Sequence, residues 1–294
     1  MLLYDLAVPL ILGRAAAALG EPMLLVKGPE VASFYPSRGL RPYHDLDLVV
    51  RSSREAQRLL IAAGFEEVGD PSIFLDIHHE RPLWWPGSPP VVVELHSRPK
   101  WVEGLPLPSF DDLLAEAEPS AIGVDQVLAP SHAHHALLLA AHSWAHVPLG
   151  RLSDLVDIAA VSQGIARDEL ERVARRWGIH RLWQTTVSVV DSTLFGQPRS
   201  SAQIVWAWNL TAARERTVLG THLERLLSPF WALSRRKAWK AFLRALAAEF
   251  EPAEGENWRE KLTRIAKAIR NAFVERSEHV RQLGAAGDRR RRSR

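Results

Sequence analysis

The 294-residue chain contains no cysteine. This absence excludes disulfide bonds, thiolate nucleophiles and cysteine-ligated zinc, and it is typical of a protein in a reducing compartment. No segment reaches the roughly 18 consecutive apolar residues that a transmembrane helix needs. The first twenty residues are rich in Leu and Ala, but they lack a basic start and contain Asp5, Pro9 and Arg14. We therefore expect an N-terminal amphipathic helix rather than a signal peptide, no membrane span, and a cytoplasmic location.

Acidic and basic residues are unevenly distributed, although the net charge is only +3. Residues 210–294 contain twenty Lys and Arg against ten Asp and Glu, so the part before them is acidic. A basic C-terminal half predicts an anionic partner such as nucleotide phosphates, nucleic acid or a lipid surface. The alternative is a set of solvated helix faces. The final residues, 285–294, are predicted to form a disordered basic tail.

The first hundred residues mix strand and helix patterns. Short apolar runs bounded by turn residues predict strands, and Ser52 with Glu55 three residues later forms a capping-box pattern that opens a helix. The predicted strands are 23–27, 45–50, 73–79 and 91–97, and the predicted helices are 29–35 and 52–63. From about residue 109 onward, apolar residues recur with helical spacing at 131–146, 151–161, 168–177, 180–195 and 258–283. We therefore predict an α+β fold with a small mixed sheet, followed by a mostly helical C-terminal region.

Carboxylates in two of the predicted strands indicate a possible metal site. Because side chains alternate along a strand, Asp45 and Asp47 project from one face of the sheet, and Glu94 and His96 share a face in another strand. Adjacent like charges on one face repel each other, and a hard divalent cation with oxygen ligands removes that cost. If the two strands pair side by side, three carboxylates converge on one metal site.

This ordered pattern resembles the nucleotidyltransferase superfamily of the DNA polymerase β type. That superfamily has a glycine turn after its first strand, then a helix, an acidic-apolar-acidic strand, and a third acidic residue on another strand. Residues 24–50, LLVKGPEVASFYPSRGLRPYHDLDLVV, more closely resemble the bacterial family of uncharacterised nucleotidyltransferases. The likeness extends to VVVELHSRP at 91–99 and to the histidine-rich helix followed by Leu152, Asp154 and Asp157. It covers about residues 20–160 and departs from the superfamily in lacking a serine in the Lys27-Gly28-Pro29 turn.

The resemblance implies a palm-like catalytic domain at 1–108 and a helical domain at 109–284 that forms one wall of the cleft. It implies transfer of a nucleoside monophosphate from an NTP, with ATP as the expected donor, to an unidentified acceptor, with release of pyrophosphate. The implied ion is Mg²⁺ or Mn²⁺, bound by Asp45, Asp47 and Glu94, and Glu94 would also orient or deprotonate the acceptor hydroxyl.

Four further residues are implied to bind the nucleotide, namely Lys27, Gly28, Arg41 and His96. Gly28 would let the backbone approach the phosphates closely, and Lys27 and Arg41 would neutralise phosphate charge. The residues leave alternatives open at two of these positions. Lys27 could extend into solvent at the strand end, and Arg41 could pair with Asp45.

Two other functions fit parts of the sequence. Five of the twelve histidines lie in the helix 131–146, and Asp154 and Asp157 follow in the next helix, so a His/Asp metal-dependent phosphoester hydrolase is one alternative. The candidate ligands are His132, His134, His135, His142 and His146. The other alternative is a non-catalytic nucleic-acid-binding protein that uses the basic C-terminal half. The acceptor, the preferred base and the oligomeric state have no readable motif.

Overall fold

A computed structural model describes residues 2–69, 80–87, 89, 91–146, 148–201, 204, 226–250, 257–263 and 266. The chain divides into two compact units, Met1–Ser200 and Ser201–Arg294. A mixed seven-stranded sheet with many helices in the first unit, and helices in the second, confirm the predicted α+β fold. The predicted strand 73–79, the tail 285–294 and most of the predicted helix 258–283 lie outside the described residues.

The sheet of the first unit has the strand order β3-β4-β5-β2-β1-β7-β6. The pairs β2–β5 and β1–β7 are parallel, and the other four pairs are antiparallel. The bounds are β1 Met23–Leu25, β2 Asp45–Val49, β3 Glu66–Glu67, β4 Leu83–Trp84, β5 Val92–His96, β6 Glu118–Pro119 and β7 Val127–Ala129. The predicted strands at 23–27, 45–50 and 91–97 are confirmed with slightly shorter bounds.

Two of the unpredicted strands lie beyond residue 108. β6 and β7 have only two or three residues, which is too short for an alternating pattern to show, and β7 pairs with β1 at Met23 and Leu24. The sheet therefore continues into a region that the sequence pattern assigned to helices almost throughout. The division of the chain at residue 108 into a catalytic and a helical domain stays a prediction.

The predicted helices in the described part of the first unit are confirmed. Its helices are α1 Leu2–Leu19, α2 Pro29–Ala32, α3 Ser53–Ala62, α5 Phe110–Ala115, α6 His132–His146, α7 Leu152–Ser162, α8 Arg167–Arg176 and α9 His180–Leu194, with a 3-10 turn η1 at Arg38–Leu40. The second unit contains α11 Pro229–Ala232 and α12 Arg235–Phe250. At the start of α3, the Ser52 hydroxyl accepts a hydrogen bond from the Glu55 N–H, which is one half of the predicted capping box, while the Glu55 carboxylate accepts from Arg58.

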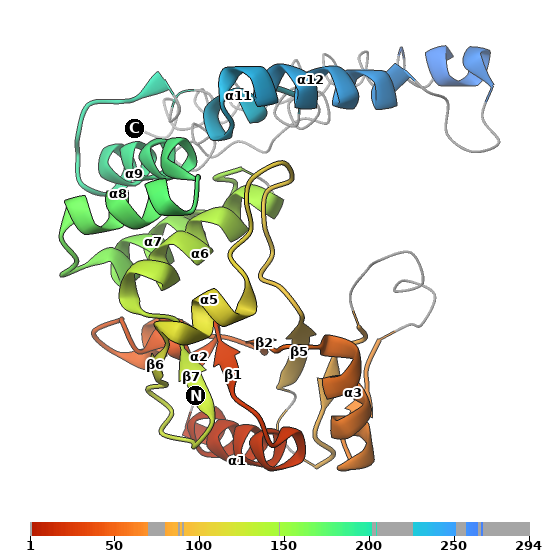
Figure 1. Ribbon diagram of the computed structural model, residues 1–294, viewed down its shortest axis with the longest axis vertical. Helices are drawn as coiled ribbons and strands as arrows, with labels where there is room; N and C mark the ends of the chain where they lie inside the picture. The colour runs from red at the N-terminus through yellow and green to blue at the C-terminus, as the bar shows by residue number, and fades with distance from the viewer. Residues whose placement is uncertain are drawn as a thin grey trace, which may run out of the picture. The chain divides into compact units, whose positions relative to one another are not determined.

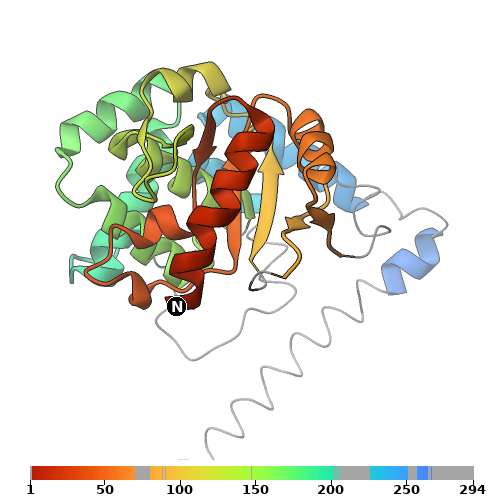
Figure 2. The same ribbon diagram turned by 90° about the horizontal axis from the view of Figure 1, so that it is seen from below.

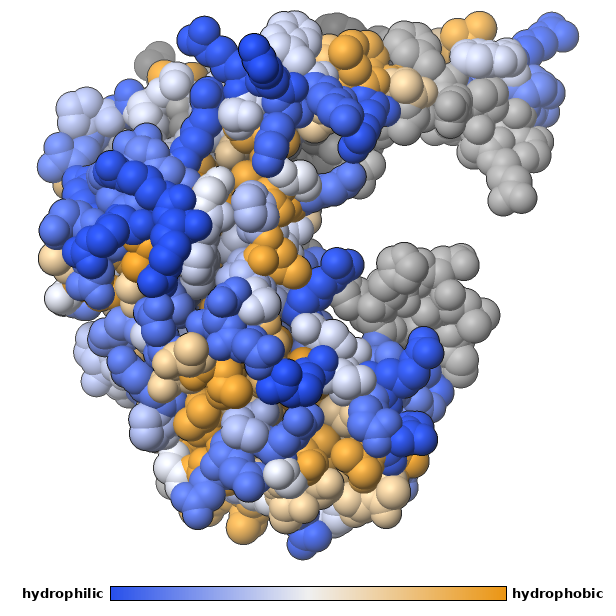
Figure 3. All heavy atoms as spheres, viewed as in Figure 1, coloured by the Kyte–Doolittle hydropathy of each residue, from blue (hydrophilic) through white to orange (hydrophobic). Residues whose placement is uncertain are grey.

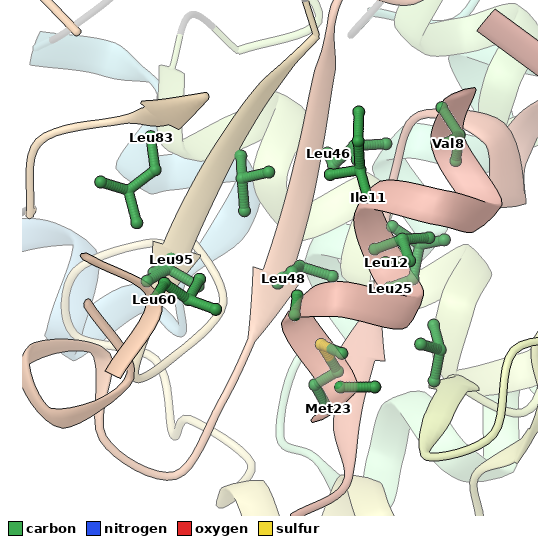
Figure 4. Packing of buried hydrophobic residues seen from close by; sticks show 14 of the residues in the cluster. Val8, Ile11, Leu12, Met23, Leu25, Leu46, Leu48, Leu60, Leu83 and Leu95 are labelled. Carbon is green, nitrogen blue, oxygen red and sulfur yellow. The ribbon is translucent and has the colours of Figure 1, made fainter. Parts of the chain in front are cut away.

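The first unit has three layers, with helices on both faces of the sheet (Figure 1). Figure 2 shows α1 and α3 lying across the same face. Leu46 and Leu48 of β2 point toward that face and pack with Ile11 and Leu12 of α1 and Leu60 of α3 (Figure 4). Each of these leucines is fully buried, which contributes about 1.5–3 kcal/mol per side chain relative to exposure. The alternating residues of β2, Asp45 and Asp47, are thereby held on the opposite face, toward α6 and α7.

The helices α6 to α9 cover the carboxylate face of the sheet and form a core of their own. Trp144 and Trp183 are buried there, and the Trp144 Nε1–H donates to the Thr186 hydroxyl over 2.8 Å. Trp239 of α12, in the second unit, is 56% exposed.

Helix α1 carries apolar side chains both on the side that packs against the sheet and on the exposed side. Its inner side buries Val8, Ile11 and other residues against the sheet, as predicted for an amphipathic helix. Hydrophobic residues also show in Figure 3 at the end of the unit where Figure 1 draws α1. The exposed large side chains of α1 are Leu3, Leu6 and Leu10. The helix is therefore less amphipathic than predicted. Among the described residues, no helix has both the length and the apolar character that a bilayer span requires.

Candidate functional site

The register of β2 and β5 brings the predicted acidic residues together. The strands are parallel neighbours, with Asp47 opposite Glu94, Asp45 opposite Val92 and Val49 opposite His96. Residues directly opposite each other in paired strands project from the same face. The side-by-side pairing that the carboxylate argument required is therefore confirmed.

These side chains line a cavity of about 420 Å³ on the face of the sheet that α6 to α9 cover. Its volume lies within the range of about 300 to 1,000 Å³ that is typical of small-molecule sites. The sheet supplies one wall, and α6 and the residue before α7 supply another. The lining residues are Val26, Lys27, Asp45, Asp47, Val49, Glu80, Pro82, Glu94, Leu95, His96, Pro99, Lys100, Leu138, Leu139, His142 and Arg151.

Three side chains in this cavity could hold a metal ion together. Asp47, Glu94 and His96 each offer one ligand atom, and these atoms all lie within 4.8 Å of one another. The His96 Nε2 lies 3.2 Å from Asp47 Oδ1 and 3.6 Å from Glu94 Oε2. Asp45 lines the same cavity but does not belong to this group. The sequence placed His96 with the nucleotide, whereas the structure places its ring among the potential metal ligands.

One oxygen of Asp47 fits a bound cation well. The residue is 6% exposed, and its Oδ2 atom is buried without a hydrogen-bond partner among the described residues. A buried carboxylate oxygen without a partner is costly. Carboxylate oxygens are suitable ligands for a divalent ion such as Mg²⁺ or Mn²⁺. The residues present therefore fit the ion that the sequence predicted.

The pKa values in the cavity reflect crowded negative charge. Burial raises the pKa of Asp45, and the charges of Asp47 and Glu94 raise it further. Burial also acts to raise the pKa of Asp47, but the hydrogen bond from His96 and the charge of Lys27 outweigh it and lower the value. Burial acts to lower the pKa of His96, yet its bonds to Asp47 and Glu94 raise it to about 9. With this pKa, His96 carries an Nε2–H that it donates to Asp47, so the ring could bind a metal ion through this nitrogen only after losing that proton.

Cationic side chains face the same cavity, and sequence analysis identified only one of them. Lys27, which was predicted, has its Nζ 2.5 Å from the Nε2 of His142 on α6. Lys100 follows β5, and Arg151 precedes α7. Lys100 could have been identified from the sequence, because it lies only four residues beyond His96. No feature of the sequence indicates Arg151, because only the packing of α7 against the sheet brings it to the cavity.

Gly28 lies directly against the strand that carries the two aspartates. Its backbone has φ +63° and ψ −125°, a conformation that is essentially restricted to glycine. A Cβ at this position would lie 2.6 Å from the backbone oxygen of Asp45. Gly28 does not itself line the cavity, so its predicted contact with phosphates stays a prediction. The close approach that the structure shows is to β2.

Arg41 is held away from the cavity lining by an ion pair with α7. Its Nε donates to Asp157 Oδ1 over 3.2 Å, and its Nη2 donates to Oδ2 over 2.9 Å. The Tyr35 hydroxyl donates to the same carboxylate over 2.5 Å. The ion-pair partner of Arg41 is therefore Asp157, not the alternative partner Asp45. A phosphate contact of Arg41 stays a prediction.

The histidines of α6 lie in different environments. His135 is fully buried and donates its Nε2–H to the Val26 carbonyl over 2.8 Å, while His134 is buried beside Glu116 and Arg176. His142 lines the cavity. Within the part of the chain that the structure describes, Asp47, Glu94 and His96 form the one group of three potential metal ligands. The described residues of α6 and α7 thus do not form the alternative His/Asp metal centre.

Comparison with known proteins gives one match. A family model described as "Uncharacterised nucleotidyltransferase" matches residues 11–194, which is more than half of the chain. No curated protein matches the chain, and no solved structure matches it. The matched region contains the whole sheet, all the cavity-lining residues and helices α6 to α9. The chain therefore belongs to this nucleotidyltransferase family, as the resemblance in residues 24–50 indicated.

Proposed function

We propose that the protein transfers a nucleoside monophosphate from ATP or another NTP to an acceptor hydroxyl and releases pyrophosphate. Family membership supports nucleotidyl transfer in general. The observation that carries the specific proposal is the buried Oδ2 of Asp47, which has no hydrogen-bond partner in the described part of the chain and lies next to Glu94 in a cavity that also contains Lys27. Such a site suits a ligand that combines a divalent cation with polyphosphate.

Asp45, Asp47 and Glu94 would hold Mg²⁺ or Mn²⁺. When bound, the ion would neutralise phosphate charge and polarise the phosphorus–oxygen bonds. His96 would keep the Asp47 carboxylate in one orientation through its hydrogen bond of 3.2 Å. Outer-shell hydrogen bonds of this kind fix the direction in which a ligand atom points.

Glu94 is the residue best placed to receive the acceptor's proton. Its side chain is 39% exposed, whereas that of Asp47 is 9% exposed, so a substrate reaches Glu94 more easily. The acceptor oxygen would lose its proton to Glu94 and form a bond to the α-phosphorus. The bond between that phosphorus and the oxygen bridging to the β-phosphate would break, and pyrophosphate would leave with the bonding electrons. Holding the reactants in line contributes most of the rate enhancement in such reactions.

Isothermal titration with a non-hydrolysable ATP analogue, with and without Mg²⁺, tests this proposal. The variant Asp47→Asn keeps the size of the side chain and removes its charge. Asp168→Asn is the matched control, because Asp168 is 83% exposed on α8 and does not line the cavity. We expect Mg²⁺-dependent binding in the wild type and in the control, and a loss of at least tenfold in Asp47→Asn. Equal binding by Asp47→Asn would refute the proposal.

The nucleic-acid-binding alternative makes a different prediction. It expects affinity for RNA or DNA that falls steeply with salt and persists in Asp47→Asn. Most of the basic residues of 210–294 lie outside the described part of the chain, so an anionic partner of this region stays a hypothesis. The acceptor of the transfer reaction is not identified by the residues of the cavity.

A further inference from the structure

Three cationic side chains reach the cavity from separate parts of the first unit. Lys27 follows β1, Lys100 follows β5 and Arg151 precedes α7. Within the described residues, no carboxylate lies within ion-pairing distance of Lys27 or Arg151. After burial, the charges of Lys27 and Arg151 act to lower the pKa of Lys100, while those of Glu94 and Asp47 act to raise it. Lys100 is therefore close enough to both Lys27 and Arg151 to be repelled by them.

Like charges that converge in a cavity are stabilised by a ligand of opposite charge. The carboxylates of β2 and β5 cannot fully serve as that counter-charge, because Asp47 already accepts the hydrogen bond of His96 and fits a metal ion. The cavity thus offers two kinds of binding group, carboxylates for a cation and Lys and Arg side chains for a multivalent anion. A metal-bound polyphosphate satisfies both groups at the same time.

We propose that Lys100 and Arg151, together with Lys27, bind the β- and γ-phosphates of the NTP and hold pyrophosphate as it leaves. This inference rests on the proposed function and assigns two substrate-binding residues that the sequence did not indicate. When the bond from the α-phosphorus to the bridging oxygen breaks, negative charge grows on the β-phosphate. Cations that face this oxygen stabilise the transition state more than the ground state.

Titration with Mg²⁺-pyrophosphate tests the assignment without knowledge of the acceptor. The variants are Lys100→Met and Arg151→Met, which keep a long side chain and remove the charge. Arg98→Met is the matched control, since Arg98 is exposed two residues from Lys100 and does not line the cavity. The ATP analogue and AMP are titrated in parallel, and a thermal melt of each variant checks its folding.

We expect each charge-removing variant to weaken pyrophosphate and ATP-analogue binding about tenfold or more, which is the size typical of a lost charge-assisted hydrogen bond. AMP binding and all binding by the control should stay at the wild-type level, and Lys100→Arg should restore part of the affinity. Unchanged pyrophosphate binding in both variants, or an equal loss for AMP, would overturn the assignment.

The failure of this inference and the failure of the proposed function give different results. If Asp47→Asn binds the ATP analogue normally while Lys100→Met loses pyrophosphate, the transferase proposal fails and the anion site stands. If Asp47→Asn loses Mg²⁺-dependent binding while Lys100→Met and Arg151→Met bind normally, the transferase proposal stands and the anion site is wrong. A wild-type protein that binds neither pyrophosphate nor the ATP analogue refutes both.

Discussion

Replacing His135 with glutamine isolates the contribution of one buried imidazole to stability. His135 is 0% exposed and donates its Nε2–H to the Val26 carbonyl, whereas its Nδ1 has no partner among the described residues. Protonation would add a second buried N–H at Nδ1 and a buried charge, so burial lowers the pKa of His135 from 6.5 to about 4. A glutamine amide can donate the same bond to Val26 without titrating.

The lowered pKa of His135 determines both the direction and the size of the change in stability with pH. The folded-state pKa lies below the unfolded one, so the stability contributed by neutral His135 is fully present above pH 6.5 and is lost as the pH falls toward 4. At 1.36 kcal/mol per pKa unit, the full loss is about 3 kcal/mol, and about 2 kcal/mol of it falls between pH 7 and pH 5. Other groups titrate equally in wild type and variant, and their effects cancel in the difference.

Urea unfolding followed by tryptophan fluorescence at pH 7 and pH 5 measures that difference. We expect the stability of the wild type relative to His135→Gln to fall by about 2 kcal/mol between the two pH values. The exposed His44 provides the control, and His44→Gln is unfolded at the same two pH values. A wild-type-minus-variant difference that is the same at both pH values would refute the reasoning.

Two further predictions concern the supports of the cavity. We expect Gly28→Ala to lower the free energy of unfolding by about 2 kcal/mol, because a φ of +63° is strained for alanine and the new Cβ would lie 2.6 Å from the Asp45 carbonyl oxygen. Urea unfolding measures this change, and a loss below about 0.5 kcal/mol would contradict the prediction. We expect Asp157→Asn to cost about 3 kcal/mol, because Arg41 keeps a largely buried charge without its ion-pair partner. The double variant Arg41→Met/Asp157→Asn should be more stable than Asp157→Asn alone in the same assay, and a further loss would count against the ion pair.

Several elements of the fold could be predicted because their signals are local. The alternation in Asp45–Val49 depends only on neighbouring residues, and so does the cap that Ser52 forms on α3. The long helices α6 to α9 repeat their apolar spacing over ten or more residues, which makes the pattern unambiguous. Strands β3, β4, β6 and β7 are too short to show a period, and they exist because neighbouring strands supply their hydrogen-bond partners.

The residues of the candidate site also divide into those that local patterns predict and those that they do not. Asp45, Asp47, Glu94 and His96 could be predicted because each pair of neighbours alternates within one strand. Their convergence depends on the pairing of β2 with β5, which the sequence left as a condition and the structure shows. Arg41 was a candidate through the family resemblance, yet Asp157, 116 residues away, is what holds its guanidinium. An ion pair between distant residues leaves no trace in the spacing of either one.

The sequence by itself determined which acidic side chains can share one face of the sheet and which ligands they suit, because these depend only on residue type and on alternation along two strands. It also determined the family, through an ordered motif that spans the first half of the chain. Only the tertiary structure decided that Lys100 and Arg151 face the carboxylates and that the α6 histidines are divided among core, cavity and surface. Those positions depend on how α6 and α7 pack over the sheet, and packing is a property of complementary surfaces that no local pattern encodes.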